Sequence, residues 1–421
     1  MAMKHGLLQL IALFLGAISL VNCSSSPSCV LVSNSAAEPV RGLMRTPAAT
    51  ATGCPVNTGG GGNNGSCSST LTPADVLFGQ ASTGAVTTLA IGTGATSLQL
   101  MCTTANTGLG LIVVANVLAT NKNYLYSLNN ITHVGTTGSV TISGFAIGHV
   151  APVTLTPLST SFTITGTSFF DGFFAFQADP SGRFLTVTDA TSSLVHILLI
   201  SSVDGTLSEA AGSPFSVANA LFTAVGASGQ FLYVTDQSDG EIFIFLINLG
   251  ANPVLTQIVN SPFVEPTHLA ANAPISMQIN LAGTFMYTAN TQSISVLAIG
   301  VDGSLTSTGA PGTFTPTFNP QLFAMDPTGS FLYVLGSGTE GVVGFTIDNG
   351  TGALTLIAGS AFASGLSVSD ILINPVGGQL YLLISGKINV YTITSGSGIL
   401  VPPSGAAQFA SSSNLAAAFV Q

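Results

Sequence analysis

The stretch that decides the fold is FLYVTDQSDGEIFIFLIN, which spans residues 231–248. Two runs rich in β-branched and aromatic residues, 231–236 and 241–247, lie on either side of Asp239-Gly240. Such runs, separated by residues that favour turns, are typical of neighbouring β-strands. The pattern therefore predicts two strands joined by a short loop.

The second of these runs recurs along the whole chain. Its seven copies lie roughly 50 residues apart and read GAVTTLAIG, GSVTISGFAIG, SSLVHILLI, GEIFIFLIN, QSISVLAIG, EGVVGFTID and GKINVYTIT. Turn-and-strand segments such as DPSGRFLTVTD and DPTGSFLYVLG precede them, and SVDGTL or GVDGSL turns follow. Asp, Pro and Gly at these places favour tight turns. Each unit is thus expected to be a four-stranded antiparallel sheet.

Seven four-stranded units predict an all-β fold, a seven-bladed β-propeller over residues 73–421. A solenoid would need capping repeats, and a membrane barrel would need aromatic girdles in a chain that has no Trp. The first unit, at ADVLFGQ, lacks a clear inner strand, whereas the tail SNLAAAFVQ resembles one. We therefore expect strands from both ends of the chain to close the ring.

These repeats resemble the seven-bladed propellers of the lactonase-like family, which includes 6-phosphogluconolactonase and the YVTN-repeat proteins. The segments that carry the resemblance are the turns DPSGRFLTVTD and ASGQFLYVTD, the strand GEIFIFLIN and the exit AGSPF. The resemblance implies the propeller fold and a family that contains both lactone hydrolases and members without established activity.

Strand direction divides the candidate site residues between two faces of the ring. Loops joining second to third strands, and connections between blades, are expected on one face, here called the loop face. The remaining turns, including that of Arg183 and one aligned with Lys122, belong on the opposite turn face. The predicted binding residues in second-to-third loops are Asn129, Asn130, Asp189, Asp236, Asp239, Asn290 and Lys387, joined by Glu265 and His268 from a connection between blades.

The hydrolytic motifs implied by the resemblance are missing. The position that would carry Pro-Arg-His reads Pro274-Ile275-Ser276, and Pro320-Gln321-Leu322 in the following blade. Glu265 and His268 are the candidate catalytic pair, against the simpler interpretation of two solvated loop residues. His196, within SSLVHILLI, is expected to pack in the sheet. The histidine and cysteine spacings predict no metal site and no cofactor.

Composition restricts the partners. Charged residues make up 5% of the chain, and the net charge is −10, with 6 Lys+Arg in 421 residues. Nucleic-acid binding needs a basic patch to displace counterions from phosphates, and this chain cannot form one. The scarcity of Lys and Arg also disfavours a dianionic phosphosugar substrate, since phosphates are usually held by these side chains.

The N-terminus predicts export. Lys4 precedes an apolar run over 7–21 that is shorter than a membrane span, which is the layout of a signal peptide over residues 1–22. The run ends at Cys23 in a sequence that resembles a bacterial lipobox, although Asn22 replaces its usual small residue. The prediction is a lipid-anchored envelope protein, with a secreted protein as the alternative.

Residues 23–72 are rich in Ser and Gly and predict a flexible tether. A disulfide between Cys54 and Cys67 is the simplest pairing in an oxidising compartment, and the pairing of Cys29 and Cys102 stays open.

Taken from the sequence, the leading function is a binding or interaction module for a small molecule, glycan or protein. The alternatives are a lactone hydrolase with a diverged site, and a structural protein of the envelope or matrix. The predicted contact with a membrane is through the N-terminal lipid anchor alone.

Overall fold

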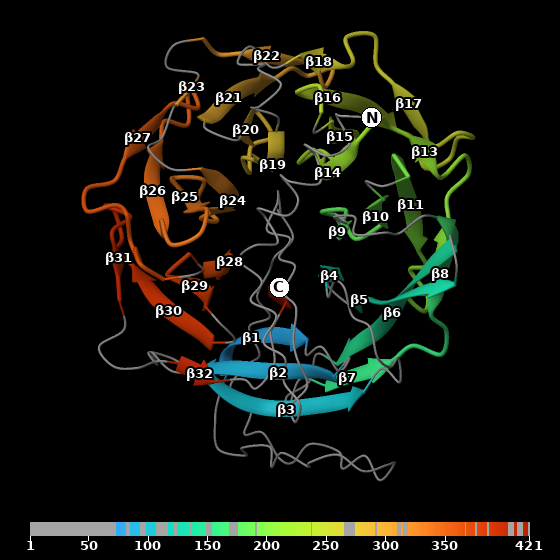
Figure 1. The fold of residues 1–421 in the computed structure, drawn as a ribbon, viewed down its shortest axis with the longest axis horizontal. Coiled ribbons are helices and arrows are strands. Elements are labelled where there is room, and N and C mark those ends of the chain that lie inside the picture. The colour runs from blue at the N-terminus through green and yellow to red at the C-terminus, as the bar shows by residue number, and fades with distance from the viewer. Residues whose placement is uncertain are drawn as a thin grey trace.

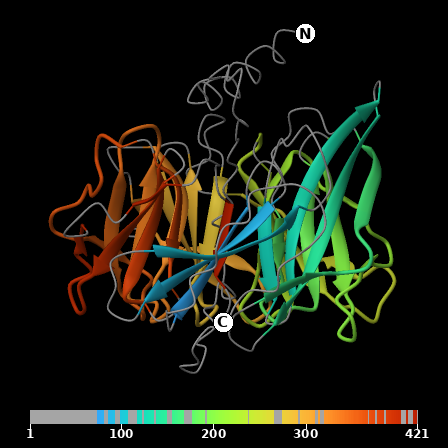
Figure 2. The same cartoon turned by 90° about the horizontal axis from the view of Figure 1, so that it is seen from below.

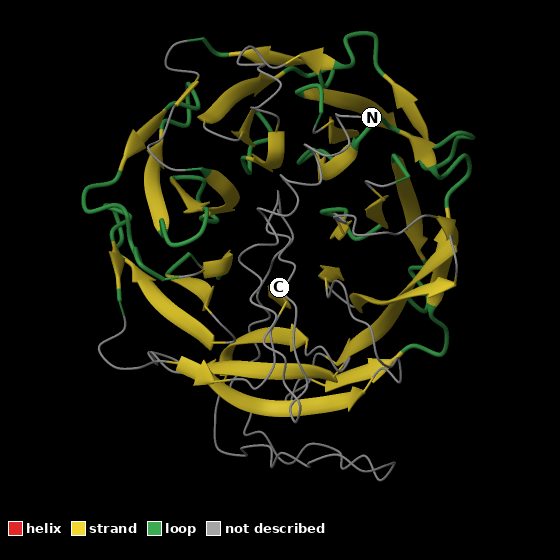
Figure 3. Ribbon diagram, viewed as in Figure 1, coloured by secondary structure: helices red, strands yellow, loops and turns green. Residues whose placement is uncertain are grey.

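The computed structural model describes residues 73–80, 85–92, 98–106, 117–121, 124–134, 137–148, 154–167, 176–189, 192–236, 238–264, 274–290, 293–309, 313–314, 319–366, 368–374, 377–384, 387–402, 408–410 and 416–419. These residues form seven antiparallel sheets around a common axis (Figure 1). They fold into strands and loops, without a helix (Figure 3). Consequently, no helix that could cross a membrane occurs in this part of the chain. The predicted seven-bladed propeller is confirmed.

The fourth blade shows the arrangement that the others repeat. From the axis outward it contains β14 (Ala220–Val225), β15 (Phe231–Asp236), β16 (Glu241–Ile247) and β17 (Leu255–Gln257). The short β18 (Phe263–Val264) pairs with the other end of β16. These outer strands of three and two residues leave little unpaired backbone at the edge of blade 4.

The remaining blades follow the same order. Blade 2 has β4 (Val117–Asn121), β5 (Tyr124–Val134), β6 (Thr137–Gly148), β7 (Thr154–Pro157) and β8 (Phe162–Thr167); blade 3 has β9 (Phe176–Ala178), β10 (Phe184–Asp189), β11 (Leu194–Ile200), β12 (Leu207–Glu209) and β13 (Phe215–Ser216). Blade 5 has β19 (Pro274–Ile279), β20 (Phe285–Asn290), β21 (Ser293–Ile299), β22 (Leu305–Ser307) and β23 (Thr313–Phe314). Blade 6 has β24 (Pro320–Met325), β25 (Phe331–Gly336), β26 (Val342–Ile347) and β27 (Leu354–Leu356), and blade 7 has β28 (Val368–Ile373), β29 (Gln379–Ile384), β30 (Lys387–Ile393), β31 (Leu400–Val401) and β32 (Gln408–Ala410).

Both ends of the chain build blade 1. Its inner strand is β33 (Ala416–Phe419), which pairs with β1 (Pro73–Gln80), followed by β2 (Ala85–Gly92) and β3 (Leu98–Asn106). The register places Ala417 opposite Gly79 and Phe419 opposite Leu77. The blue β1 and the red C-terminal strand therefore lie side by side (Figure 2). The prediction that a C-terminal strand completes the first blade is confirmed.

The hydrophobic core lies between successive blades. Val234 packs with Val195 of blade 3, whereas the adjacent Tyr233 packs with Met277 of blade 5. Neighbouring residues of β15 thus face opposite blades, as the two-residue period of a strand requires. Because both faces of each inner sheet are covered, the second strands of blades 3 to 7 are buried over almost their whole length.

Buried tyrosines also connect the blades. The hydroxyl groups of Tyr126, Tyr233, Tyr287 and Tyr333 each donate to a glycine carbonyl in the next blade, at 2.7, 3.0, 3.1 and 2.6 Å. Burial raises the pKa of all four phenols above the ordinary value. The acceptor of Tyr233 is Gly303, whose φ is +81° and where a Cβ would lie 2.4 Å from the Phe231 ring. Glycine is needed there both for backbone conformation and for close approach.

The Asp-rich turns form as predicted. In the turn of β24 and β25, the Phe331 amide donates to Asp326 Oδ1 at 2.6 Å, and Gly329 donates to the Asp326 carbonyl at 2.9 Å. In the GVDGSL turn, the Ser304 hydroxyl and amide donate to Asp302 Oδ1 at 2.6 and 3.1 Å. These bonds hold the pKa of Asp302 below its usual range. Asp326 and Asp302 are therefore turn formers.

Candidate functional site

Three of the predicted binding residues occupy one repeated position, the last residue of a second strand. Asp189 ends β10, Asp236 ends β15 and Asn290 ends β20. Their exposed fractions are 0, 1 and 0%, so the structure places them inside the ring rather than on an open rim. A buried polar side chain needs hydrogen-bond partners from the protein or from ordered water.

Asp236 finds its partners in the loop that follows it. Its Oδ1 accepts hydrogen bonds from the Ser238 amide at 2.8 Å, the Ser238 hydroxyl at 2.9 Å and the Asp239 amide at 3.3 Å. This is the local capping for which Asp is favoured in turns. Asp239 itself is exposed. The Asp236 carboxylate thus shapes the loop between β15 and β16.

Asp189 and Asn290 are used similarly. Asp189 Oδ1 accepts the amide of Ser192 at 3.0 Å, and Asn290 Nδ2 donates to the Ser295 hydroxyl at 2.9 Å. Asp189 Oδ2 and Asn290 Oδ1 are buried without a hydrogen-bond partner. The three residues are equivalent in their blades, and each one bonds within its own blade.

The other predicted residues fall into two groups. Asn129 and Asn130 lie inside β5, which runs on to Val134, so their expected placement in a loop is wrong. The β-branched run Ile131-Thr132 extends this hairpin, and the register shifts at Asn130 as in a β-bulge. Lys387 begins β30, and its side chain, like those of Asn129 and Asn130, is outside the described part.

Several sequence predictions lie outside the described residues. Glu265 and His268 are among them, as are Cys23, Cys29, Cys54 and Cys67; Cys102 lies in β3, with its side chain not described. Their catalytic, lipidation and disulfide assignments stay predictions.

The inner strands β19 and β24 each have an irregular register at the end that meets the loop face. β19 and β24 both begin with Pro, and the register shifts directly afterwards, at Ile275 and Gln321. β-Bulges of this kind re-aim side chains at the rim of a sheet. Ile275 packs against the apolar core, while the Ser276 hydroxyl donates to the Gln321 carbonyl at 2.7 Å. These positions therefore contribute packing and a bond between blades, which the sequence did not indicate.

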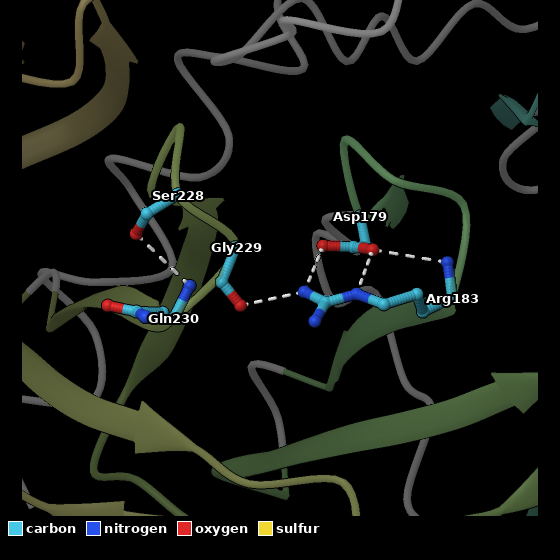
Figure 4. A network of polar contacts seen from close by, with 5 residues as sticks. All are labelled: Asp179, Arg183, Ser228, Gly229 and Gln230. Atoms are coloured by element: carbon cyan, nitrogen blue, oxygen red, sulfur yellow. Dashed lines mark hydrogen bonds and ion pairs between the residues drawn. The ribbon is translucent and has the colours of Figure 1, made fainter.

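Among the Lys and Arg residues of the propeller, Arg183 has its side chain described, and this side chain contacts two neighbouring residues (Figure 4). Its Nε and one terminal nitrogen contact the two Asp179 oxygens at 2.8 Å each, and that nitrogen also donates to the Gly229 carbonyl at 2.7 Å. The hydrogen bonds to Asp179 raise the pKa of Arg183. Asp179 and Gly229 lie in the turns between first and second strands, so Arg183 clamps blade 3 to blade 4 on the turn face.

A second group of polar side chains surrounds His196, whose partners the sequence did not indicate. His196 Nδ1 lies 2.9 Å from Glu209 Oε1, and the Ser213 hydroxyl donates to the same oxygen at 2.5 Å. The Ser213 oxygen also accepts the Ile197 amide at 2.9 Å. His196 is 3% exposed, which confirms that it packs in the sheet. The signal was a lone polar residue within an apolar third strand, with Glu209 ending a short outer strand.

Metal ligands do not cluster in the part of the chain that the structure describes. No group of three or more His, Cys, Asp or Glu suited to a metal ion occurs among the described residues. A cavity of about 10 Å³ lies between blades 2 and 3, lined by residues that include Tyr126, Phe162 and Leu207. That volume suits a single water molecule.

Comparisons with known proteins agree with the fold. Residues 219–368 match the family model described as lactonase, 7-bladed beta-propeller. A search of curated proteins found no match. Among solved structures, a provisional 6-phosphogluconolactonase from Bacteroides fragilis aligns with a TM-score of 0.64 and 17% identity, over 82% of this chain and 98% of that one.

Two further structures are similar. A provisional 6-phosphogluconolactonase from Bacteroides uniformis has a TM-score of 0.64 and 18% identity, with 82 and 98% of the two chains covered. The periplasmic gluconolactonase PpgL from Pseudomonas aeruginosa has a TM-score of 0.61 and 15% identity, with 82 and 99% covered. At these identities the structures support the fold alone. With the match to the family model over blades 4 to 6, they agree with the resemblance stated above: the chain is a seven-bladed β-propeller, and its residues 219–368 are similar to the lactonase family.

Proposed function

We propose that this propeller is a binding or interaction module that uses its loop face, and that it has not kept the catalytic motifs of the lactonase-like family. The observation that carries the proposal is the use of Asp189, Asp236 and Asn290. Each sits where a second strand reaches the loop face, and each is buried and bonded within its own blade. Groups that shape loops in this way support a rigid surface rather than proton transfer to a substrate.

Charge supports the same proposal. Hydrolysis of a phosphosugar lactone needs donors for the phosphate and for the developing oxyanion. Arg183 is committed to Asp179 and Gly229 on the turn face. With a net charge of −10, the chain also repels anionic substrates at low salt. The favoured ligand is a neutral small molecule, a glycan or a protein.

A second candidate function is a lactone hydrolase with a diverged site. The names of the similar Bacteroides and Pseudomonas proteins favour it, and Glu265 and His268 would be the general base and its partner. This candidate differs from the first in requiring turnover, which makes the two separable by one assay.

The assay compares the purified protein with a Glu265→Gln, His268→Ala double variant on 6-phosphogluconolactone and on neutral gluconolactone. We expect both proteins to leave each lactone at its spontaneous rate of hydrolysis. Hydrolysis by the parent protein that is lost in the double variant would overturn the binding-module proposal. Activity on the neutral lactone alone would overturn it too, while keeping the argument against phosphate.

A stability measurement distinguishes loop formers from substrate-binding groups. Asp236→Ala removes the acceptor of three hydrogen bonds, so we expect the free energy of unfolding to fall by about 1–3 kcal/mol. Replacing a strained catalytic group commonly leaves stability unchanged or raises it. An unchanged or higher Tm in Asp236→Ala would therefore argue for a catalytic or substrate-binding role.

For the location of the protein, we propose export and lipid anchoring through Cys23. Replacing Cys23 by Ala should move the protein from the membrane fraction to the soluble fraction, because a single residue would carry the acyl chains. Unchanged partitioning of the variant would favour a secreted protein.

A further inference from the structure

Two buried atoms of blade 3 have no hydrogen-bond partner: Asp189 Oδ2 and His196 Nε2. Asp189 is 0% and His196 3% exposed, so neither atom is compensated by bulk water. An unpartnered polar atom in the interior is costly, and in native proteins it usually has a partner, often an ordered water.

The two side chains lie on the same side of the sheet. In the register of β10 and β11, Asp189 pairs with Leu194 and Val187 pairs with His196. Asp189 and His196 are therefore diagonal neighbours, within reach of each other for long side chains. Val187 packs with Val140 of blade 2, so this side of blade 3 faces blade 2.

Blade 5 shows how close this diagonal brings two side chains. Asn290 pairs with Ser293, and Thr288 pairs with Ser295. In this register Asn290 corresponds to Asp189, and Ser295 corresponds to His196. Across that diagonal, Asn290 Nδ2 donates to the Ser295 hydroxyl at 2.9 Å. The same two positions in blade 3 thus point into one shared space, but Asp189 and His196 do not bond directly.

Hydrogen-bonding chemistry explains the missing bond. Glu209 Oε1 is a carboxylate acceptor, so His196 Nδ1 carries the hydrogen that joins them. In the neutral ring, Nε2 then presents a lone pair, as does Asp189 Oδ2. Two acceptors cannot bond to each other, whereas one small molecule with two donors satisfies both.

We propose that a single buried water molecule occupies this space and donates one hydrogen to His196 Nε2 and the other to Asp189 Oδ2. It completes a chain of hydrogen bonds from Glu209 on the outer strand, through His196 and Asp189, to the Ser192 amide. His196 is then a positioning residue: through the water it holds Asp189, which in turn holds the start of the loop between β10 and β11. This inference does not depend on which ligand the loop face takes.

The direct test is a crystal structure of the full chain at a resolution that shows ordered water. The expected result is one water oxygen about 2.6–3.2 Å from both Asp189 Oδ2 and His196 Nε2. An empty space between the two atoms, or a direct contact between them, would overturn the proposal. This test does not require any variant to fold.

A double-mutant cycle tests the positioning role in solution. His196→Ser alone removes the imidazole that links Glu209 to the proposed water. Asp189→Asn alone replaces the carboxylate that accepts the Ser192 amide with a neutral amide. Each change should lower the Tm. The combined variant recreates the Asn290–Ser295 pair of blade 5 and should recover most of the loss. Losses that simply add would contradict the proposed coupling.

Amide hydrogen exchange gives the matched control within the same molecule. In His196→Ser, we expect the Ser192 amide to exchange several-fold faster, because its acceptor Asp189 is no longer held. The Ser238 amide makes the corresponding bond to Asp236 in blade 4 and should keep its rate. Equal acceleration at Ser192 and Ser238 would indicate general destabilisation and overturn the positioning role.

Discussion

The hydroxyl of Tyr233 in blade 4 donates to the carbonyl oxygen of Gly303 in blade 5, 3.0 Å away and 70 residues later in the chain. Both residues are buried. The bond fastens the second strand of one blade to the outer hairpin of the next. The same bond recurs with Tyr126, Tyr287 and Tyr333, so a buried tyrosine fastens each of these blades to the next blade along the chain.

Removing one of these hydroxyls should loosen the ring by a measurable amount. Tyr287→Phe keeps the packed aromatic side chain but leaves the Gly352 carbonyl without its hydrogen-bond donor. We therefore expect a loss of about 1–3 kcal/mol in the free energy of unfolding. The measurement is denaturant unfolding, with Tyr126→Phe for comparison. Because the two sites are in different blades, their losses should add in the double variant. A double variant no less stable than either single one would contradict the account.

The contact with Arg183 leaves less room for a side chain at Gly229 than at Gly329, the equivalent turn position of blade 6. Gly229 and Gly329 both have a positive φ, +68° and +69°. A Cβ at Gly229 would lie 2.5 Å from an Arg183 nitrogen, whereas at Gly329 its nearest neighbour is 3.8 Å away. Gly329→Ala should cost about 1 kcal/mol for backbone strain alone, and Gly229→Ala should cost more because it also displaces Arg183.

The same pair of variants carries its own control. In an Arg183→Ala background the clamp is already gone, so Gly229→Ala should then cost no more than Gly329→Ala. Thermal unfolding of the four proteins measures this. If Gly229→Ala remained the costlier change without Arg183, the clamp would not be the reason.

Acid should open the outer hairpins before it unfolds the ring. The bonds from Ser304 hold the pKa of Asp302 below the unfolded value of about 4. A lowered folded pKa means that this contribution is present above pH 4 and is lost as the pH falls through the folded pKa. Protection of the Ser304 amide from hydrogen exchange should therefore decrease in that range. In Asp302→Asn the acceptor oxygen does not titrate, so a decrease at the same pH in that variant would contradict the explanation.

The repeats and the ring closure could be predicted because their signals are local. Period-two strands and Asp-Gly turns can be identified within a few residues, and the tail SNLAAAFVQ resembles the inner strands of the other blades. Asp189 and Asp236 were also placed correctly at the loop side of their strands. Their role was not predictable, since burial at 0 and 1% depends on a neighbouring blade.

Contacts between blades were the part that the sequence did not show. Arg183 meets Gly229 46 residues later, and Ser276 meets Gln321 45 residues later, with no motif linking either pair. The placement of Asn129 and Asn130 in a loop failed because β5 and β6 extend beyond the lengths of their counterparts. The two contacts between blades depend on three-dimensional neighbours rather than on local propensity.

The ring is closed because both ends of the chain share blade 1, and one crosslink tests this closure directly. Gly79 and Ala417 are paired across β1 and β33. Cysteines at paired positions of adjacent strands are close enough for a disulfide. Peptide mapping of oxidised Gly79→Cys, Ala417→Cys protein should find the 79–417 crosslink in nearly all molecules, and in few molecules when the cysteine is moved from 417 to 416. Absence of the 79–417 crosslink, or equal crosslinking at 416, would contradict the closed ring.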